Sequence, residues 1–293
     1  MKKILIIFFL FVVPRVQGIS IRDIDRLHLK GCSLEKFGIL DTTELVVRYD
    51  LNYLQDTTGR MLSRFDVLIF QIGRKYTKFY GLKSYMMDLS YTKRLKGELW
   101  TEADKEQFRL AGDGIVDYEI IHDIDNGNLL SQHHIPFEEN YIIQYSEKVP
   151  MLEWRITQKS KSILGYDCWL ATTSFGGRRW LAWFTPSIPC QFGPWKMSGL
   201  PGLILELEDE QRHFIFSAVE IAQTREPIKY YQRPTLEWTK HKWQLFDKKA
   251  HLSPLATFGK NGQIDFYRAD MSTKTLVPLD ETWTIPYNPL ELE

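Results

Sequence analysis

The sequence predicts a mainly β protein: an antiparallel meander that forms one curved sheet or half-barrel, with one or two helices packed on it. Three observations lead to this fold class. Aromatic residues make up 14% of the 293-residue chain, and they favour strands and β-rich cores. Apolar residues alternate with polar ones in runs that Gly-, Asn- and Asp-rich turns separate. Each predicted hairpin joins neighbours in sequence, which is how antiparallel strands connect.

The first residues predict export. Residues 1–18 combine lysines, an apolar run over 4–13 and a small-residue segment, in the order of a secretory signal peptide with cleavage after Gly18. The apolar run is too short to cross a bilayer, which needs about 20 residues. We therefore expect a protein of the periplasm or cell envelope that is soluble after cleavage and has no transmembrane segment. Residues 19–293 should form a single β-rich domain, with a loosely held C-terminal tail over 283–293.

Turn signals then divide the chain into strands. Residues Thr43 to Tyr53 predict a long strand, and a second strand follows around Phe65 to Gln71. The pair Asn126-Gly127 predicts a type I′ hairpin turn, and Asn261-Gly262 predicts another. Gly176-Gly177 separates two further alternating runs, so it should also join a hairpin.

Two segments depart from the strand pattern. Leu99 to Ala111 contains no Gly or Pro and is followed by a glycine stop signal, so it predicts a helix. Pro234 to His251 predicts a second helix, with Leu236, Trp243 and Phe246 near one face. We expect this second helix to pack against the sheet.

Residues 174–209 concentrate Trp, Phe, Gly and Pro. Several residues between Thr185 and Pro201 precede proline and are therefore biased toward extended backbone, which predicts a stiff loop without helix. Within it, Pro201 and Gly202 suit the two central positions of a type II turn, which needs a positive φ at Gly202. Gly199 should lie in ordinary extended backbone. The predicted structural turn comprises Gly199, Leu200, Pro201 and Gly202.

The same loop supplies the candidate contact residues. A stiff, proline-rich loop holds aromatic rings with little conformational entropy left to lose, and rigid aromatics make efficient contact area. Trp183, Phe192 and Trp195 are therefore the candidates for contact with a ligand or partner. The alternative is that these rings only close one end of the sheet.

The sequence contains none of the catalytic motifs that we examined, including a zinc-protease helix, a nucleophile elbow, a phosphate loop and a dinucleotide fingerprint. His133 and His134 are adjacent on a predicted strand, so they point to opposite faces and do not share one metal ion. Asp123 to Asn128 is better explained by the hairpin than by calcium. Whether Cys168 pairs with Cys190 stays open. We therefore assign no catalytic residue, no metal and no cofactor.

One stretch carries a family resemblance. Residues 163–209 contain ILGYDCWLATT, RRWLAWFTPSIP and FGPWKMSGLPGLILELED, and the chain closes with NPLELE. With the hexapeptide GLPGLI at Gly199 to Ile204, the sequence resembles the GLPGLI family of exported proteins from Bacteroides-group bacteria. The resemblance implies association with the cell envelope and no established activity.

Three functions remain compatible with the sequence. The formal charge is zero and no basic run occurs, so nucleic-acid binding is excluded. The first function is a non-catalytic envelope protein that binds an apolar small molecule or lipid, in the manner of a carrier. The second is an interaction accessory of an outer-membrane transport or surface complex. The third is an enzyme of unrecognised type, which the absence of a catalytic set makes the weakest.

Overall fold

The structure is a computed structural model whose described residues divide into two compact units. One unit comprises Asp25–Trp238 with Asn288–Glu293, and the other comprises Met1–Ile24 with Thr239–Tyr287. The sequence indicates no boundary at Trp238, where it predicts the interior of a helix. The described residues are 4–8, 33–34, 37–57, 63–114, 116–135, 141–231, 234–258, 264–270, 275–278 and 282–292.

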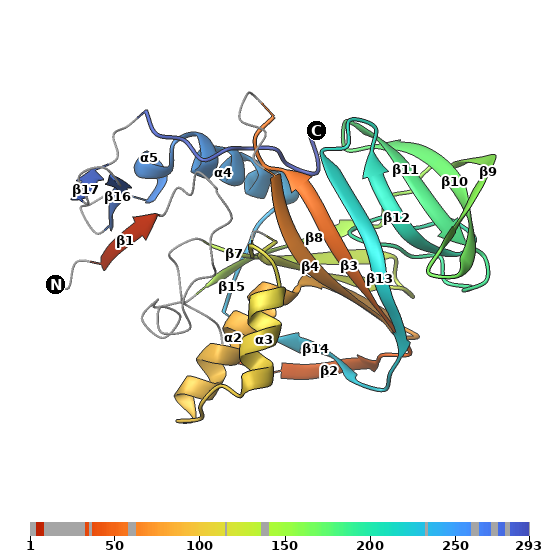
Figure 1. Cartoon of the computed structure of the whole chain (residues 1–293), viewed down its shortest axis with the longest axis horizontal. Helices are drawn as coiled ribbons and strands as arrows, with labels where there is room; N and C mark the ends of the chain where they lie inside the picture. The colour runs from red at the N-terminus through yellow and green to blue at the C-terminus, as the bar shows by residue number, and fades with distance from the viewer. Residues whose placement is uncertain are drawn as a thin grey trace. The chain divides into compact units, whose positions relative to one another are not determined.

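The larger unit contains an open twelve-stranded sheet (Figure 1). Its order is β15-β8-β7-β6-β5-β4-β3-β13-β12-β11-β10-β9, and every pairing is antiparallel except β15 with β8. The sheet consists of two meanders, β3–β8 and β9–β13, that the pairing of β13 with β3 joins into one. The predicted mainly β, antiparallel fold class is confirmed. The strand bounds are β3 Leu45–Leu54, β4 Ser63–Ile72, β5 Tyr76–Gly81, β6 Tyr118–Asp123, β7 Asn128–His134, β8 Ile142–Lys148, β9 Arg155–Ile163, β10 Tyr166–Phe175, β11 Arg178–Thr185, β12 Leu203–Asp209, β13 Phe214–Gln223 and β15 Thr235–Glu237.

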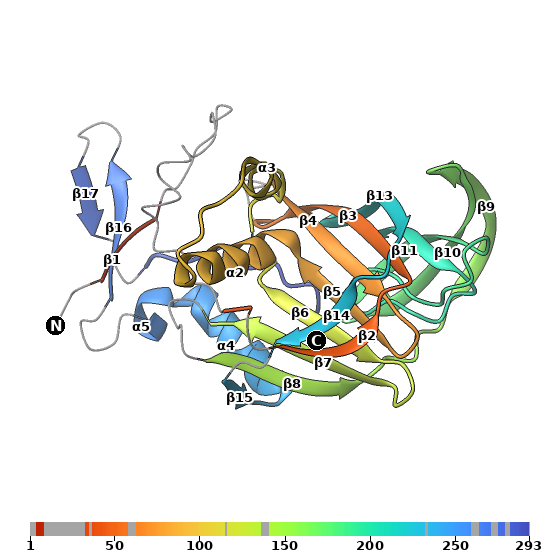
Figure 2. The same ribbon diagram turned by 90° about the horizontal axis from the view of Figure 1, so that it is seen from below.

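One face of this sheet carries the hydrophobic core. Alternation places Val47, Tyr49 and Leu51 of β3 on that face, all at most 1% exposed. Trp180 of β11 is the largest fully buried side chain among the described residues. The sheet curls strongly toward β9, as Figure 2 shows. A separate two-stranded ribbon pairs β2 (Phe37–Thr42) with β14 (Pro227–Tyr231).

The hairpin turns confirm one prediction in full and one in part. Gly176 and Gly177 form the two-residue turn between β10 and β11, with φ of +59° and +71° as a type I′ turn requires. Asn126-Gly127 also lies in a hairpin, but the paired residues Asp123 and Asn128 enclose four residues, so the two-residue type I′ turn is wrong there. The Asp123 carboxylate accepts the Asn126 N–H at 3.1 Å and stabilises the longer loop. Asn261-Gly262 lies outside the described residues.

Two helices belong to the sheet unit. α3 (Glu102–Leu110) confirms the helix predicted from Leu99, and a capping box between Thr101 and Asp104 sets its first turn. α2 (Leu82–Leu95) is not predicted by the sequence, because it follows β5 directly without a cap hydrogen bond or a turn signal. α2 contacts β4 and β5 and buries Met86 completely. The helix that packs on the sheet is therefore α2.

The described residues of the smaller unit form three strands and two helices. β1 (Ile4–Phe8) pairs in parallel with β16 (Ile264–Asp270), which pairs with β17 (Thr275–Pro278) in antiparallel orientation. α4 spans Lys240–Leu252 and α5 spans Pro254–Phe258.

Two predictions for this part of the chain are wrong. The helix predicted from Pro234 begins only at Lys240, because Thr239 caps it with a side-chain hydrogen bond to the Lys242 N–H. Leu236 lies in β15 and does not share a face with Trp243. Leu255 to Phe258, which would belong to the first strand of the predicted Asn261-Gly262 hairpin, lie in α5 instead.

The two ends of the chain concern the predicted signal peptide and the predicted loosely held tail. Of the predicted signal peptide, only Ile4–Phe8 are described, and its cleavage stays a prediction. None of the described helices is both long enough and apolar enough to span a membrane. The sequence led us to expect a loosely held tail, but Asn288–Leu292 is hydrogen-bonded to the sheet unit: the Leu292 N–H donates to the Gly176 carbonyl at 2.8 Å.

Candidate functional site

The candidate site is built around the loop that connects β11 to β12, residues 186–202. All of its residues are described and none is helical, as predicted. Two proline-centred turns shape it: the Cys190 N–H donates to the Ile188 carbonyl at 2.7 Å, and the Gly202 N–H donates to the Leu200 carbonyl at 2.8 Å. A hydrogen bond between residues i and i+2 defines a γ-turn, whose central φ matches that of proline.

The Leu200–Gly202 γ-turn corrects the predicted type II turn. Gly202 has φ of +159°, which is close to fully extended backbone. A Cβ atom at Gly202 would lie 2.1 Å from the Thr185 carbonyl oxygen, so close backbone approach is what requires glycine there. Gly199, predicted to be ordinary extended backbone, has φ of +92°. Gly202 thus has the predicted positive φ, but its value is far from the roughly +80° that a type II turn requires, and Gly199 has a positive φ that the sequence did not predict.

Backbone and side-chain hydrogen bonds tie the loop to itself and to its neighbours. The Gly199 N–H donates to the Gln191 carbonyl at 2.9 Å, and the Leu203 N–H donates to the Ile188 carbonyl at 3.2 Å. The Trp154 indole N–H, from the segment before β9, donates to the Ser198 carbonyl at 2.8 Å. These hydrogen bonds hold the loop in a fixed conformation and position.

Trp195 sits in this loop with a strained backbone. Its φ is +60°, which is unusual for a bulky residue, and the Met197 N–H closes the turn by donating to the Pro194 carbonyl at 3.3 Å. The ring packs 5.4 Å from the ring of Phe175 and 5.5 Å from that of Trp180, between centroids. The residue is 6% exposed. The structure thus places Trp195 in the core, where its packing holds the strained turn.

Trp183 lies on the opposite face of β11. Its strand neighbours Ala182 and Phe184 are buried in the core, so alternation turns Trp183 outward, where it is half-buried. The ammonium of Lys161 lies 4.5 Å from the centre of its ring. The three candidate aromatics are therefore not brought together: Phe192 and Trp195 meet at one cavity, and Trp183 stands apart.

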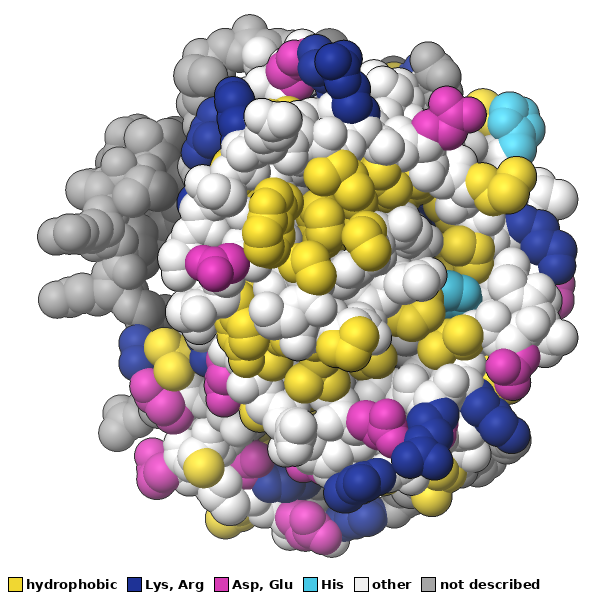
Figure 3. Space-filling view, turned by 90° about the vertical axis from the view of Figure 1, so that its right-hand side faces the viewer, with side chains coloured by type: hydrophobic (Ala, Val, Ile, Leu, Met, Phe, Trp, Pro, Cys, Tyr) yellow, Lys and Arg dark blue, Asp and Glu magenta, His cyan; other side chains and the backbone are white. Residues whose placement is uncertain are grey.

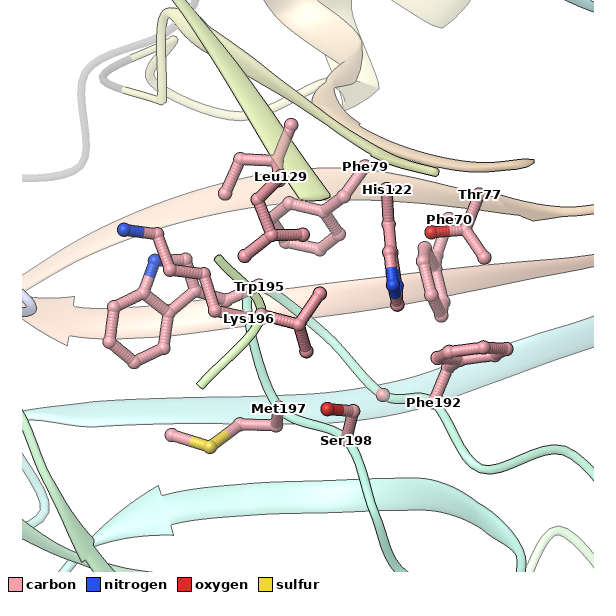
Figure 4. Close-up of a pocket in the computed structure, with 13 residues that line it drawn as sticks. Phe70, Thr77, Phe79, His122, Leu129, Phe192, Trp195, Lys196, Met197 and Ser198 are labelled. Atoms are coloured by element: carbon pink, nitrogen blue, oxygen red, sulfur yellow. The ribbon is translucent and has the colours of Figure 1, made fainter. Parts of the chain in front are cut away.

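Phe192 and Trp195 line a small cavity under the loop (Figure 4). The cavity has a volume of about 10 Å³, which is about the space of one water molecule. The His122 ring meets the Phe192 ring edge-on at 5.1 Å, and burial lowers the pKa of His122. The complete lining is Phe70, Thr77, Phe79, Ile120, His122, Leu129, Val149, Phe192, Gly193, Trp195, Lys196, Met197 and Ser198.

Beyond the cavity lies a buried ion cluster that the sequence does not reveal. The Lys196 side chain extends along Trp195, so that its ammonium points away from the cavity (Figure 4). This ammonium forms ion pairs with Glu147 of β8 and with Glu291 near the C-terminus, and the side chain is 2% exposed. The three residues are far apart in sequence, so no local pattern could have predicted the cluster.

His133 belongs to the surroundings of this cluster. Its ring stacks on Tyr145 with centroids 5.4 Å apart and an interplanar angle of 15°. Burial, together with the nearby Lys196 charge, lowers the pKa of His133 well below its usual value. His133 is therefore neutral at pH 7, and the positive charge of the cluster resides on Lys196.

The two described cysteines are protonated thiols, and the described acidic residues form no metal-binding cluster. Cys168 and Cys190 are free thiols, and burial raises the pKa of each to about 11, so both are protonated at neutral pH. Within the described residues, no three His, Cys, Asp or Glu side chains are grouped so as to hold a metal ion.

The fold and the site together define the class of protein. It is an open, mainly antiparallel β protein in which a hydrogen-bonded, aromatic-rich loop connects β11 to β12. A family model described as "Protein of unknown function (Porph_ging)" matches residues 176–206, from the turn before β11 to the middle of β12. This match is consistent with an exported protein of Bacteroidetes type. No curated protein matches the chain.

Two solved structures of PNGF-II are similar in part. The first, in the P21 space group, has a TM-score of 0.49 and 13% identity, and the second, in the C2 space group, has a TM-score of 0.45 and 14% identity. Each match covers 71% of this chain, but only 34% and 33% of the respective PNGF-II chains. The chain thus spans about a third of the length of these proteins.

Proposed function

We propose that the chain is a non-catalytic binding protein of the cell envelope, and that a partner protein docks on its loop face. The loop face comprises residues 149–156, the β9–β10 hairpin and the loop 186–202. The observation that carries the proposal is the apolar surface on this side of the molecule: Figure 3 shows apolar side chains gathered near its centre and charged ones around them. Exposed apolar side chains of the loop face include Met151, Ile156, Leu164 and Trp169.

The dimensions of the cavity favour a partner protein over a carried lipid. A site that encloses a small molecule usually has a volume of about 300–1,000 Å³, whereas the cavity beneath Phe192 has about 10 Å³. This cavity is therefore too small to hold the ligand of a carrier protein. An accessory role in an outer-membrane transport or surface complex needs only the exposed surface.

The charge around the loop face indicates the chemistry of the partner. Strand β9 carries Arg155, Lys159 and Lys161 and no acidic residue, and most of it is exposed. A partner with an apolar centre and an acidic rim would complement this edge. The convergent titratable groups, Lys196 with Glu147 and Glu291, are buried in ion pairs, which suits stability rather than catalysis.

Envelope localisation is part of the proposal and has its own test. The charged, apolar and small-residue order of residues 1–18 supports cleavage after Gly18, and the family match supports export. N-terminal sequencing of protein from isolated envelopes should begin at Ile19. An intact Met1 on that material would contradict export by cleavage.

Site-specific photo-crosslinking in intact cells tests the docking surface. A photoreactive amino acid placed at Met151 or at Gln191 should give the same protein adduct, because both positions are exposed on the loop face. The control position is Glu106, which is exposed on α3. The additional substitution Ile156→Asp should reduce the adduct several-fold, since it places a charge in the apolar surface and leaves the core intact.

The outcomes separate the candidate functions. One protein adduct, common to Met151 and Gln191 and absent at Glu106, supports docking. Adducts of equal yield at all three positions would refute a specific surface. Lipid adducts without a protein adduct would favour the carrier function instead.

A further inference from the structure

The C-terminal strap, Asn288–Leu292, is held by a buried arginine of the sheet unit. The Arg178 guanidinium donates from Nη2 to the Asn288 side-chain oxygen at 2.6 Å and to the Pro289 carbonyl at 2.7 Å. It also donates from Nε to the Leu290 carbonyl at 3.2 Å. The Arg178 side chain is only 4% exposed. Most of the hydrogen bonds of this fixed side chain therefore serve the strap.

Further contacts recognise the strap along its length. The Asn288 amide donates to the Leu54 carbonyl at 2.6 Å. Glu291 pairs with the buried Lys196 ammonium. The strap passes so close to Gly176 that a Cβ atom there would lie 3.0 Å from the Glu291 side chain. The side-chain amide of Asn288, the backbone carbonyls of Pro289 and Leu290 and the carboxylate of Glu291 thus each have a defined partner, as the groups of a peptide have in a binding groove.

The two buried cations that contact the strap each have a second, anionic partner in the sheet unit. Arg178 keeps its ion pair with Asp209, at 3.1 Å and with both side chains at most 4% exposed. Lys196 keeps its ion pair with Glu147. Departure of the strap therefore leaves neither buried cation without a counter-charge, which removes the main cost of exchanging one peptide for another.

An open pocket lies beside Leu292 of the strap. Residues of the β10–β11 and β12–β13 turns line it. A peptide longer than the strap would have further surface to contact there, including Arg179 and Glu210. The residues that line the open part are Ser174, Phe175, Gly176, Gly177, Arg178, Arg179, Asp209, Glu210, Gln211 and Leu292.

The position of the strap in the chain adds a consequence. The segment Thr239–Tyr287 of the smaller unit is connected to the sheet unit at Trp238 and, through the strap, at Asn288. Docking of the strap holds both ends of this segment at the sheet unit, and release frees its C-terminal end.

We propose that the strap occupies a peptide-binding groove of the sheet unit, and that an extended acidic peptide of a partner protein, with Asn-Pro-Leu-Glu chemistry, binds there in its place. The groove shares the buried Lys196 and the end of β10 with the loop face, but it needs none of the exposed apolar side chains there, so the inference does not depend on the proposed function. Exchange of the strap for the partner's peptide frees one end of the smaller unit.

The test uses the full chain with a weakened strap, carrying Asn288→Ala and Glu291→Ala. The probe is a fluorescein-labelled synthetic peptide of sequence YNPLELE, and its binding is followed by fluorescence anisotropy. The variant should bind the peptide saturably, and the wild-type chain should bind it at least tenfold more weakly because its own strap competes. A scrambled peptide should not bind, and adding Arg178→Lys to the variant should abolish binding, since lysine cannot supply the guanidinium geometry.

Two results would overturn the proposal. One is a variant with a cooperative thermal melt that does not bind the peptide. The other is equal binding of the native and scrambled peptides. If the variant does not fold, hydrogen exchange on the wild-type chain decides: saturating peptide should accelerate exchange of the Leu292 amide, which the Gly176 carbonyl otherwise protects, and unchanged exchange would rule the proposal out.

Discussion

Lys196→Ala is expected to lower the free energy of unfolding by about 3–5 kcal/mol, because it removes the cation that two buried carboxylates share. Lys196 is 2% exposed, and its partners Glu147 and Glu291 are 17% and 11% exposed. Water is therefore a poor substitute for the missing ammonium. Urea unfolding followed by tryptophan fluorescence measures the change, and Trp195 beside Lys196 reports directly on the site.

Lys161→Ala is the matched control for this substitution. Lys161 also pairs with a glutamate, Glu206, but the two side chains are 37% and 31% exposed. Solvent screens such a pair, so the loss should be about 1 kcal/mol or less. Equal losses for the two variants would show that the buried cluster contributes no more than a surface ion pair.

The strands were predictable because their signals are local. Alternation from Thr43 to Tyr53 predicts β3, and the two glycines at 176 and 177 predict the β10–β11 turn. The same reasoning missed α2, whose sequence lacks the start signals that define a helix from sequence alone. Contact with β4 and β5 stabilises α2, and such tertiary contacts are invisible in a local window.

The candidate site was predictable only in part. The loop dense in proline and aromatic residues was correctly predicted to lack helix, but it contains turns where the sequence predicts extended backbone. The sequence could not tell which of its rings is buried, because that depends on the face of β11 that Trp183 occupies and on the strained turn that directs Trp195 into the core. The ion cluster could not be predicted from sequence, because its residues come from β8, the loop and the C-terminal strap.

Gly202 and Gly199 have different surroundings: a Cβ atom would meet the backbone at close range at Gly202 and only ordinary contacts at Gly199. Gly202→Ala should lower the free energy of unfolding by about 3 kcal/mol. Its Cβ atom would lie 2.1 Å from the Thr185 carbonyl oxygen and 2.8 Å from the Pro186 nitrogen, and both belong to the backbone, which cannot rotate away. Gly199→Ala should cost about 1 kcal/mol, because the only penalty there is a φ of +92°. Chemical denaturation of both variants measures the difference.

Substitution by asparagine distinguishes a cost that comes from positive φ from one that comes from a clash of the Cβ atom. Asn tolerates positive φ better than Ala does, so Gly199→Asn should recover part of the loss seen with Gly199→Ala. At Gly202 the obstacle is the Cβ atom itself, which Asn and Ala share, so Gly202→Asn should be no more stable than Gly202→Ala. If Asn instead restored stability at Gly202 and not at Gly199, the positive φ of a type II turn at Gly202 would explain the hexapeptide better than the close approach to Thr185.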